Sequence, residues 1–141
     1  MDRRTLLAAL AATAPLMLAH AEEGKEGHKA MGNAHGHTAL IESASHCIAI
    51  SELCVDHCLD MMAHGDNSMV SCMRTANSVI AVCTALRTLA SQNAPATKSL
   101  AKVAAQVCED CRKECDKHPE MAPCVACGKS CSDCAKACTT A

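Results

Sequence analysis

Thirteen cysteines are the residues of this 141-residue sequence with the most evident capacity for chemistry. Their share of the chain lies far outside ordinary composition. They fall into four groups, and most steps within a group are three or four residues. Residues three or four apart share one face of an α-helix, so the spacing predicts helices that each carry a stripe of thiols. The cysteines are Cys47, Cys54, Cys58, Cys72, Cys83, Cys108, Cys111, Cys115, Cys124, Cys127, Cys131, Cys134 and Cys138.

Four helical segments with short breaks are expected to position these thiols. Gly65 is suited to end the first segment, and Asp66 or Asn67 to cap the second. A proline at position 95 marks the next break, and Pro123 is well placed in the first turn of the last helix. Period-two alternation, the signal of a half-buried strand, is absent from the sequence. The expected helices cover about 38–64, 66–91, 96–117 and 123–138.

The thiol stripes fall on the faces that would meet in a bundle core. The eleven-residue step between Cys72 and Cys83 is filled by Ala76 and Val79 at steps of 4, 3 and 4. Every cysteine therefore lies on one a/d stripe of its helix. The sequence predicts an all-α fold, an antiparallel four-helix bundle with a cysteine-lined core. Five further residues continue the stripes toward the helix ends: Leu40, Ala44, Leu86, Ala101 and Ala104.

Packing alone is a poor explanation for so many core cysteines. The chain has no Phe, Tyr or Trp, so its core depends on aliphatic residues, Met and Cys. A buried free cysteine behaves as a small hydrophobe. A leucine buries more apolar area, and a bundle that needed only stability would use leucine instead. We therefore interpret the stripe as a ligand set. The net charge of −2 gives no support for a nucleic-acid partner.

Disulfides, zinc and iron–sulfur clusters each fit this pattern poorly. Partners on one helix have parallel Cα–Cβ directions, and an odd number of cysteines leaves at least one thiol unpaired. Disulfides between some cysteines of different helices remain an alternative. Zinc takes four ligands, usually from CxxC pairs on loops, and the three CxxC pairs here lie within expected helices. The loop-borne cysteine run of a ferredoxin-type cluster is absent from the sequence.

Copper(I) fits the pattern well, because it is soft, prefers thiolates and thioethers and accepts few ligands. Sulfurs at i and i+4 can hold one ion without unwinding the helix, and four CxxxC pairs are present. If each thiolate bridges two ions, capacity approaches about one copper per cysteine. A Cu⁺ that replaces each thiol proton also leaves the buried core neutral. The pairs are Cys54/Cys58, Cys111/Cys115, Cys127/Cys131 and Cys134/Cys138.

The N-terminal region is expected to act in export and to lie outside the bundle. Residues 1–21 combine Arg3-Arg4, an apolar run and a small-x-small cleavage site at 19–21. The start resembles a twin-arginine signal, whose machinery exports folded proteins; a general secretory signal is the alternative. Residues 22–37, rich in Gly and His, predict a flexible tail, and 38–141 the bundle. The expected location is the periplasm or another compartment outside the cytosol, with no membrane span.

Three segments carry a resemblance to a known family. They are SHCIAISELCVDHCLDMM at 45–62, VCEDCRKECDKHP at 107–119 and CVACGKSCSDCAKAC at 124–138. The sequence resembles the copper storage proteins, cysteine-lined four-helix bundles that hold many Cu(I) ions. The resemblance covers the chain from about Thr38 to its end. It implies storage of copper for copper enzymes, without showing which enzyme, and assembly into a homo-oligomer, a tetramer of bundles.

The resemblance also implies copper ligands at one open end of the bundle. The matching positions are His57, Met61 and Met69, and His64 stands where the family has a further Met. Methionine as ordinary core filler is the alternative for each thioether. Elsewhere His46 and His118 are expected as surface or capping residues and not as ligands. Two roles remain open for the histidines and the methionine of the tail: loose capture of copper, or no role beyond a solvated linker. These residues are His28, Met31, His35 and His37.

The resulting hypothesis is a protein without enzymatic activity that stores multiple Cu(I) ions, for supply or for sequestration. The thirteen cysteines would hold copper in the interior, and His57, Met61 and Met69 would line the mouth. Two rivals remain. A thiol redox enzyme would use a CxxC pair, either Cys108/Cys111 or Cys124/Cys127, but needs an exposed cysteine of low pKa. A single-ion copper chaperone would need only one or two surface thiols.

Overall fold

The structure is a computed structural model that describes residues 36–141. The expected signal at 1–21 and nearly all of the expected tail at 22–37 lie outside the described residues. The described residues form helices and turns, without strands. The elements are α1 (Thr38–Ala63), a 3₁₀ turn η1 (Asn67–Met69), α2 (Val70–Ser91), α3 (Thr97–Cys115) and α4 (Ala122–Thr139).

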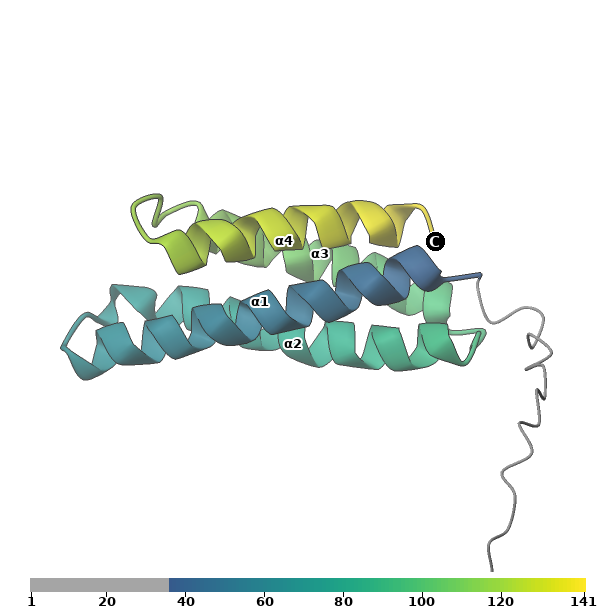
Figure 1. Ribbon diagram of the computed structural model, residues 1–141, viewed down its shortest axis with the longest axis horizontal. Helices are drawn as coiled ribbons and strands as arrows, with labels where there is room; N and C mark the ends of the chain where they lie inside the picture. Colours follow the sequence, from purple (N-terminus) through teal and green to yellow (C-terminus); the bar gives the residue numbers. More distant parts are fainter. Residues whose placement is uncertain (1–35) are drawn as a thin grey trace, which may run out of the picture. The chain divides into compact units, whose positions relative to one another are not determined.

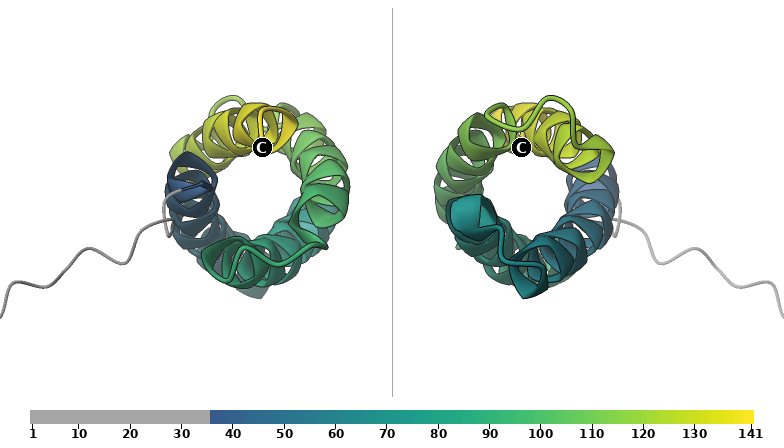
Figure 2. Two further views of the ribbon diagram at one scale, coloured as in Figure 1. Left: turned by 90° about the vertical axis from the view of Figure 1, so that its right-hand side faces the viewer. Right: turned by 90° about the vertical axis from the view of Figure 1, so that its left-hand side faces the viewer.

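The four α-helices form an antiparallel bundle in which helices consecutive in the chain pack against each other, and α1 also packs against α4. Figure 1 shows the helices lying side by side with short connections at alternate ends, and Figure 2 shows them arranged around a common axis. The predicted all-α four-helix bundle is confirmed. The α1–α2 and α3–α4 connections lie at one end, which we call the loop end, and the α2–α3 connection lies at the other (Figure 1).

The breaks between helices have local causes that the sequence indicated. Gly65 adopts a φ of +92°, a left-handed conformation that ends α1. The Asp66 side chain then accepts a hydrogen bond from the Ser68 backbone N–H at 2.9 Å and caps η1, which leads into α2. Pro123 occupies the first turn of α4, where its missing N–H costs nothing. These features confirm the expected roles of Gly65, Asp66 and Pro123.

The core divides along its length into an aliphatic end and a cysteine-lined remainder. At the end opposite the loop end, buried aliphatic side chains and Thr97 fill the space between the helices. No cysteine comes before Cys47 on α1 or before Cys108 on α3. Hydrophobic burial at this end therefore holds the helices together without using thiols. The buried residues there are Leu40, Ala44, Leu86, Ala90, Thr97, Ala101 and Ala104.

By length and composition alone, α1 and the segment Asn67–Ser91 pass as candidates for membrane spans. The buried residues of each follow a single stripe, and charged residues such as Glu52, Asp60 and Arg87 are exposed on the remaining faces. A core helix of a bundle satisfies the same criterion, so this finding is weak evidence for a membrane.

Substitution of Gly65 tests the conformational origin of the α1–α2 break. Apart from Gly65 and its two neighbours in the chain, no atom lies within 4 Å of the position where a Cβ would stand, so an alanine meets only backbone strain. We expect Gly65→Ala to lower the free energy of unfolding by about 1–2 kcal/mol, the cost of a left-handed conformation for an L-residue. Urea unfolding of the reduced protein, followed by circular dichroism, measures it. Gly65→Asn is the control and should cost less, because Asn tolerates this region; equal losses for both variants would contradict the explanation.

Candidate metal centre

All thirteen cysteines lie in the interior of the bundle as free thiols. Each is buried, and the most exposed is Cys138 at 5%. The stripes predicted on the separate helices thus meet along one axis. In the described residues, four groups of three or four cysteines have all their sulfur atoms within 4.8 Å of one another.

One four-sulfur group lies toward the aliphatic end and draws one cysteine from each helix. It consists of Cys47, Cys83, Cys108 and Cys134. The Cys83 sulfur lies 4.0 Å from that of Cys108 and 3.9 Å from that of Cys134. Cys138, one turn beyond Cys134 on α4, follows on the same side. Four helices therefore converge on a single layer of sulfur.

A second four-sulfur group lies toward the loop end. It consists of Cys54, Cys58, Cys72 and Cys124. The Cys72 sulfur is central: it lies 3.7 Å from Cys54, 3.7 Å from Cys115 and 4.0 Å from Cys124. Cys115 thereby adds α3 to a group that α1, α2 and α4 begin.

Two three-sulfur groups connect these layers. One is formed by Cys54, Cys115 and Cys127, and the other by Cys111, Cys127 and Cys131. The Cys111 and Cys127 sulfurs are 3.9 Å apart, and Cys131 lies 3.8 Å from Cys47 in the far layer. The sulfurs therefore form an unbroken column of contacts along the bundle.

The closest sulfur contacts run between helices. The CxxxC pairs Cys54/Cys58 and Cys127/Cys131 each fall within one of the four groups. The sulfur–sulfur contacts of 3.7–4.0 Å, however, all join cysteines on different helices. Spacing within one helix does not reveal these contacts, because they depend on the register between helices.

Serine occupies one position of the cysteine stripe on α1. Ser51 is fully buried on α1 midway between Cys47 and Cys54, at steps of four and three. Its hydroxyl lies 3.7 Å from the Cys127 sulfur. The seven-residue step between Cys47 and Cys54 was the sequence signal that a further core residue lies between them.

The distances fit soft-metal binding better than the alternatives. Sulfurs 3.7–4.0 Å apart are in contact without being bonded. Two groups offer the four ligands that zinc takes, but zinc sites are usually closed and separate. Here Cys54 and Cys127 each belong to two groups. Shared sulfurs suit an ion that accepts two or three bridging thiolates, as Cu(I) does.

Burial makes a bare thiolate costly in this core. Desolvation is the main cause that raises the pKa of Cys58 to about 12 and that of Cys124 to about 11. At Cys127, hydrogen bonds from Cys111 and Cys115 act in the opposite direction and lower the pKa of its thiol. A bound Cu⁺ in place of each lost proton would keep the interior neutral.

The expected mouth residues lie toward the loop end. Met69 is fully buried, and Met61 is partly buried against the core. His57 is half-buried, and its Nε2 lies 3.0 Å from the Sδ of Met121. Met121 stands in the α3–α4 connection and was missed by sequence reasoning. Its position between Pro119 and Pro123, at the same end as the α1–α2 turn, was the available signal.

The other described histidines are exposed or half-buried. His46 is exposed, as expected. His64 is exposed, and its Nδ1 lies 2.8 Å from the carbonyl oxygen of Asp60, so it is directed back onto α1. His118 is half-buried in the α3–α4 connection, and His37 precedes α1. The tail residues His28, Met31 and His35 lie outside the described residues.

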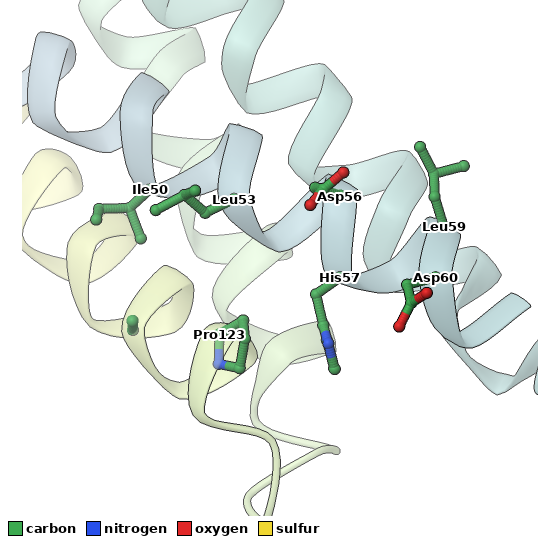
Figure 3. A pocket seen from close by; sticks show the side chains of 8 residues that line it. Ile50, Leu53, Asp56, His57, Leu59, Asp60 and Pro123 are labelled. Carbon is green, nitrogen blue, oxygen red and sulfur yellow. The ribbon is translucent and has the colours of Figure 1, made fainter.

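A surface groove between α1 and the start of α4 is separate from the sulfur column. Its lining includes Ile50, Leu53, His57 and Pro123, and no cysteine contributes to it. Figure 3 shows Ile50 and Leu53 directed from α1 toward α4, with His57 near the beginning of α4. His57 thus lies at the edge of both the groove and the loop end.

The fold and its interior define a class of protein: a four-helix bundle built around a column of free thiols. A family model described as "Csp: Copper storage protein" matches residues 33–141. The chain belongs to this copper storage protein family, as the sequence resemblance indicated.

Two solved structures agree with this chain in fold, and a further relative agrees in sequence. Cu(I)-bound copper storage protein BsCsp3 is 27% identical with a TM-score of 0.68, over 72% of this chain and 93% of that one. Ccsp from Streptomyces lividans, in a structure loaded with 10 copper equivalents, has 27% identity and a TM-score of 0.68, over 79% and 91%. YhjQ of Bacillus subtilis strain 168, described as an uncharacterized cysteine-rich protein, is 28% identical over 71% of this chain and 90% of its own length.

The raised thiol pKa values predict that the metal-free bundle loses stability in alkali. Below pH 9, near the ordinary thiol pKa, Cys58 and Cys124 are protonated in both states. Between pH 9 and about 12 the unfolded chain loses protons that the folded Cys58 retains, so the free energy of unfolding falls. Urea unfolding of the reduced protein from pH 8 to 11 measures the slope. The double variant Cys58→Ser/Cys124→Ser should show a shallower decline; a slope as steep as that of the native protein would refute these assignments.

Proposed function

We propose that this protein stores multiple Cu(I) ions on the thiolates of its core. The observation that carries the proposal is the column of thirteen buried cysteines, whose sulfurs form connected groups within a bundle of the copper storage protein family. The Cu(I)-bound and copper-loaded states of two relatives support the same metal.

The chemistry follows from soft ligands in a dry, preformed core. Each Cu⁺ displaces one thiol proton and is held by two or three sulfurs that it shares with neighbouring ions, so no net charge is buried. Sulfurs shared between groups allow neighbouring ions to be bridged by one thiolate. The helices need not unwind, because the sulfur atoms already lie within 4.8 Å of their partners in each group. All thirteen cysteines are proposed as metal ligands.

Copper is proposed to enter and leave at the loop end. His57, Met61 and Met69 lie toward this end, and Met121 joins them through its contact with His57. Imidazole and thioether bind Cu(I) more weakly than thiolate, so they can pass ions to the column without trapping them. At the other end aliphatic side chains fill most of the core, and Cys138 and His37 are the potential copper ligands among the described residues there.

Storage accounts for the cysteines better than catalysis or single-ion delivery. A thiol redox enzyme needs an accessible cysteine of low pKa, whereas no cysteine here exceeds 5% exposure. A chaperone that exchanges one ion with a partner needs one or two surface thiols. We therefore propose a protein without enzymatic activity whose copper is kept for supply to copper enzymes or for sequestration.

Export and self-association complete the proposal. The Arg3-Arg4 pair and the apolar run after it support export by the twin-arginine route to the periplasm or a similar compartment. Leu53 and Val125, 63% and 51% exposed on neighbouring helices, are apolar side chains that a second copy would cover in a homo-oligomer.

Copper capacity is the decisive measurement. An anaerobic titration of the reduced protein with Cu(I), against a competing chelator, should saturate near one ion per cysteine, about thirteen per chain. Helical circular dichroism should stay unchanged, because the bundle is preformed. Saturation at only one or two ions would overturn storage and favour the chaperone or redox hypothesis.

Variants at the loop end test the entry route. His57→Ala and Met121→Leu should each slow Cu(I) uptake several-fold in stopped-flow measurements while leaving the capacity within about one ion of native, since the thiols remain. His46→Ala is the matched control, because His46 is an exposed histidine on the same helix. A loss of capacity with an unchanged rate, or an equal effect of the control, would contradict this role.

A further inference from the structure

The thiol column narrows in the middle of the bundle. On α1 the stripe position between Cys47 and Cys54 is taken by Ser51. On α2 the stripe positions between Cys72 and Cys83 are taken by Ala76 and Val79, both fully buried. Two of the four helices therefore contribute no sulfur at this level.

The antiparallel register places these interruptions opposite each other. Cys54 contacts Cys72, and Cys47 shares a four-sulfur layer with Cys83. The residues between them, Ser51 on α1 and Ala76 and Val79 on α2, therefore face the same stretch of the core. The contact between Ser51 and Cys127 shows that this stretch of the core lies at the level of Cys127 on α4.

Within residues 36–141, sulfur at the level of Ser51 comes from α3 and α4 alone. Their three thiols, Cys111, Cys127 and Cys131, form a group that we call the waist. The other ten cysteines divide evenly around it. The loop-end compartment contains Cys54, Cys58, Cys72, Cys115 and Cys124, and the far compartment contains Cys47, Cys83, Cys108, Cys134 and Cys138.

We propose that the store consists of two copper compartments joined by this waist, and that the far compartment fills and empties through Cys127 and Cys131. The inference rests on the proposed storage function. Cys127 shares one group with Cys54 on the loop-end side and another with Cys131. Cys131 then contacts Cys47, 3.8 Å away in the far compartment. These contacts form a continuous path for an ion.

Passage through the waist is a ligand exchange without electron transfer. As a Cu–S bond to Cys131 forms, a Cu–S bond on the loop-end side breaks. The thiol that accepts the ion loses a proton, and the thiolate that releases the ion gains one, so charge balances. Hydroxyl and alkyl groups are poor ligands for Cu(I), so Ser51, Ala76 and Val79 offer no second route.

The far end is packed mainly by apolar side chains. Leu40, Leu86 and Ala90 are at most 3% exposed and lie beyond Cys47 on α1 and Cys83 on α2. Cys138, in the last turn of α4, is the one far-compartment thiol at this end, and it is only 5% exposed. Apolar side chains packed at interior density leave neither ligands nor space for an ion. Ions that enter at the loop end therefore have to pass the waist to reach the far compartment.

Stopped-flow uptake of Cu(I) by the reduced full chain tests the proposal. Native protein should fill in two phases of similar amplitude, and amide NMR at about five ions per chain should show changes at loop-end cysteines first. Cys131→Ser, nearly isosteric, should slow the second phase at least about tenfold, an increase of about 1.4 kcal/mol in its barrier. Ser51→Cys, which adds a sulfur at the waist, should accelerate that phase and add about one ion of capacity.

Cys138→Ser is the matched control, because it removes one thiol beyond the waist. It should lower capacity by about one ion and leave the rate of the second phase unchanged. Circular dichroism checks that each variant folds. A single filling phase, or a second phase in Cys131→Ser within twofold of native, would overturn the two compartments while leaving storage intact. Native saturation at one or two ions would instead overturn storage itself.

Discussion

A thiol buried in a helical bundle can be neutral in two ways, by keeping its proton or by binding a metal cation. This constraint governs the interior of the protein, where all thirteen cysteines are buried. With protons bound, the core is a set of small hydrophobes that packs well enough to keep the helices together. With Cu⁺ bound, the same geometry becomes a neutral copper–sulfur network. Because the core is neutral in both states, the fold need not change when copper replaces the protons.

The size of cysteine sets how the helices pack. Gly128 on α4 shows how closely α3 and α4 approach: a Cβ there would lie 3.3 Å from the Cβ of Cys115. Small side chains on facing stripes bring sulfurs from different helices into contact, which larger residues would prevent. The hydrophobic burial lost in the thiol region is supplied partly by the aliphatic end, where Leu40 and Leu86 lie. Stability and metal binding are thus assigned to different parts of one core.

Much of the fold was predictable because its determinants are local. Steps of three and four residues placed the cysteines on helix faces, and Gly65 and Pro123 marked helix ends that the structure has. What could not be predicted depends on how the helices sit against one another. The contact of His57 with Met121 joins residues 64 positions apart, and the Cys47–Cys131 contact joins residues 84 apart. Spacing within one helix contains no information about either pair, since both depend on the register between helices.

The register between helices also explains why a core position without cysteine affects metal binding. A missing cysteine on one helix would be a minor defect if the facing helix supplied sulfur at that level. Here Ser51 on α1 lies at the same level as Ala76 and Val79 on α2. At this level, therefore, the α1–α2 side of the core has no sulfur ligand. An ion that moves by exchange between neighbouring thiolates depends on the narrowest part of its path. Control of copper movement within this bundle therefore rests on the few sulfurs that α3 and α4 provide at the waist, and less on the total number of cysteines.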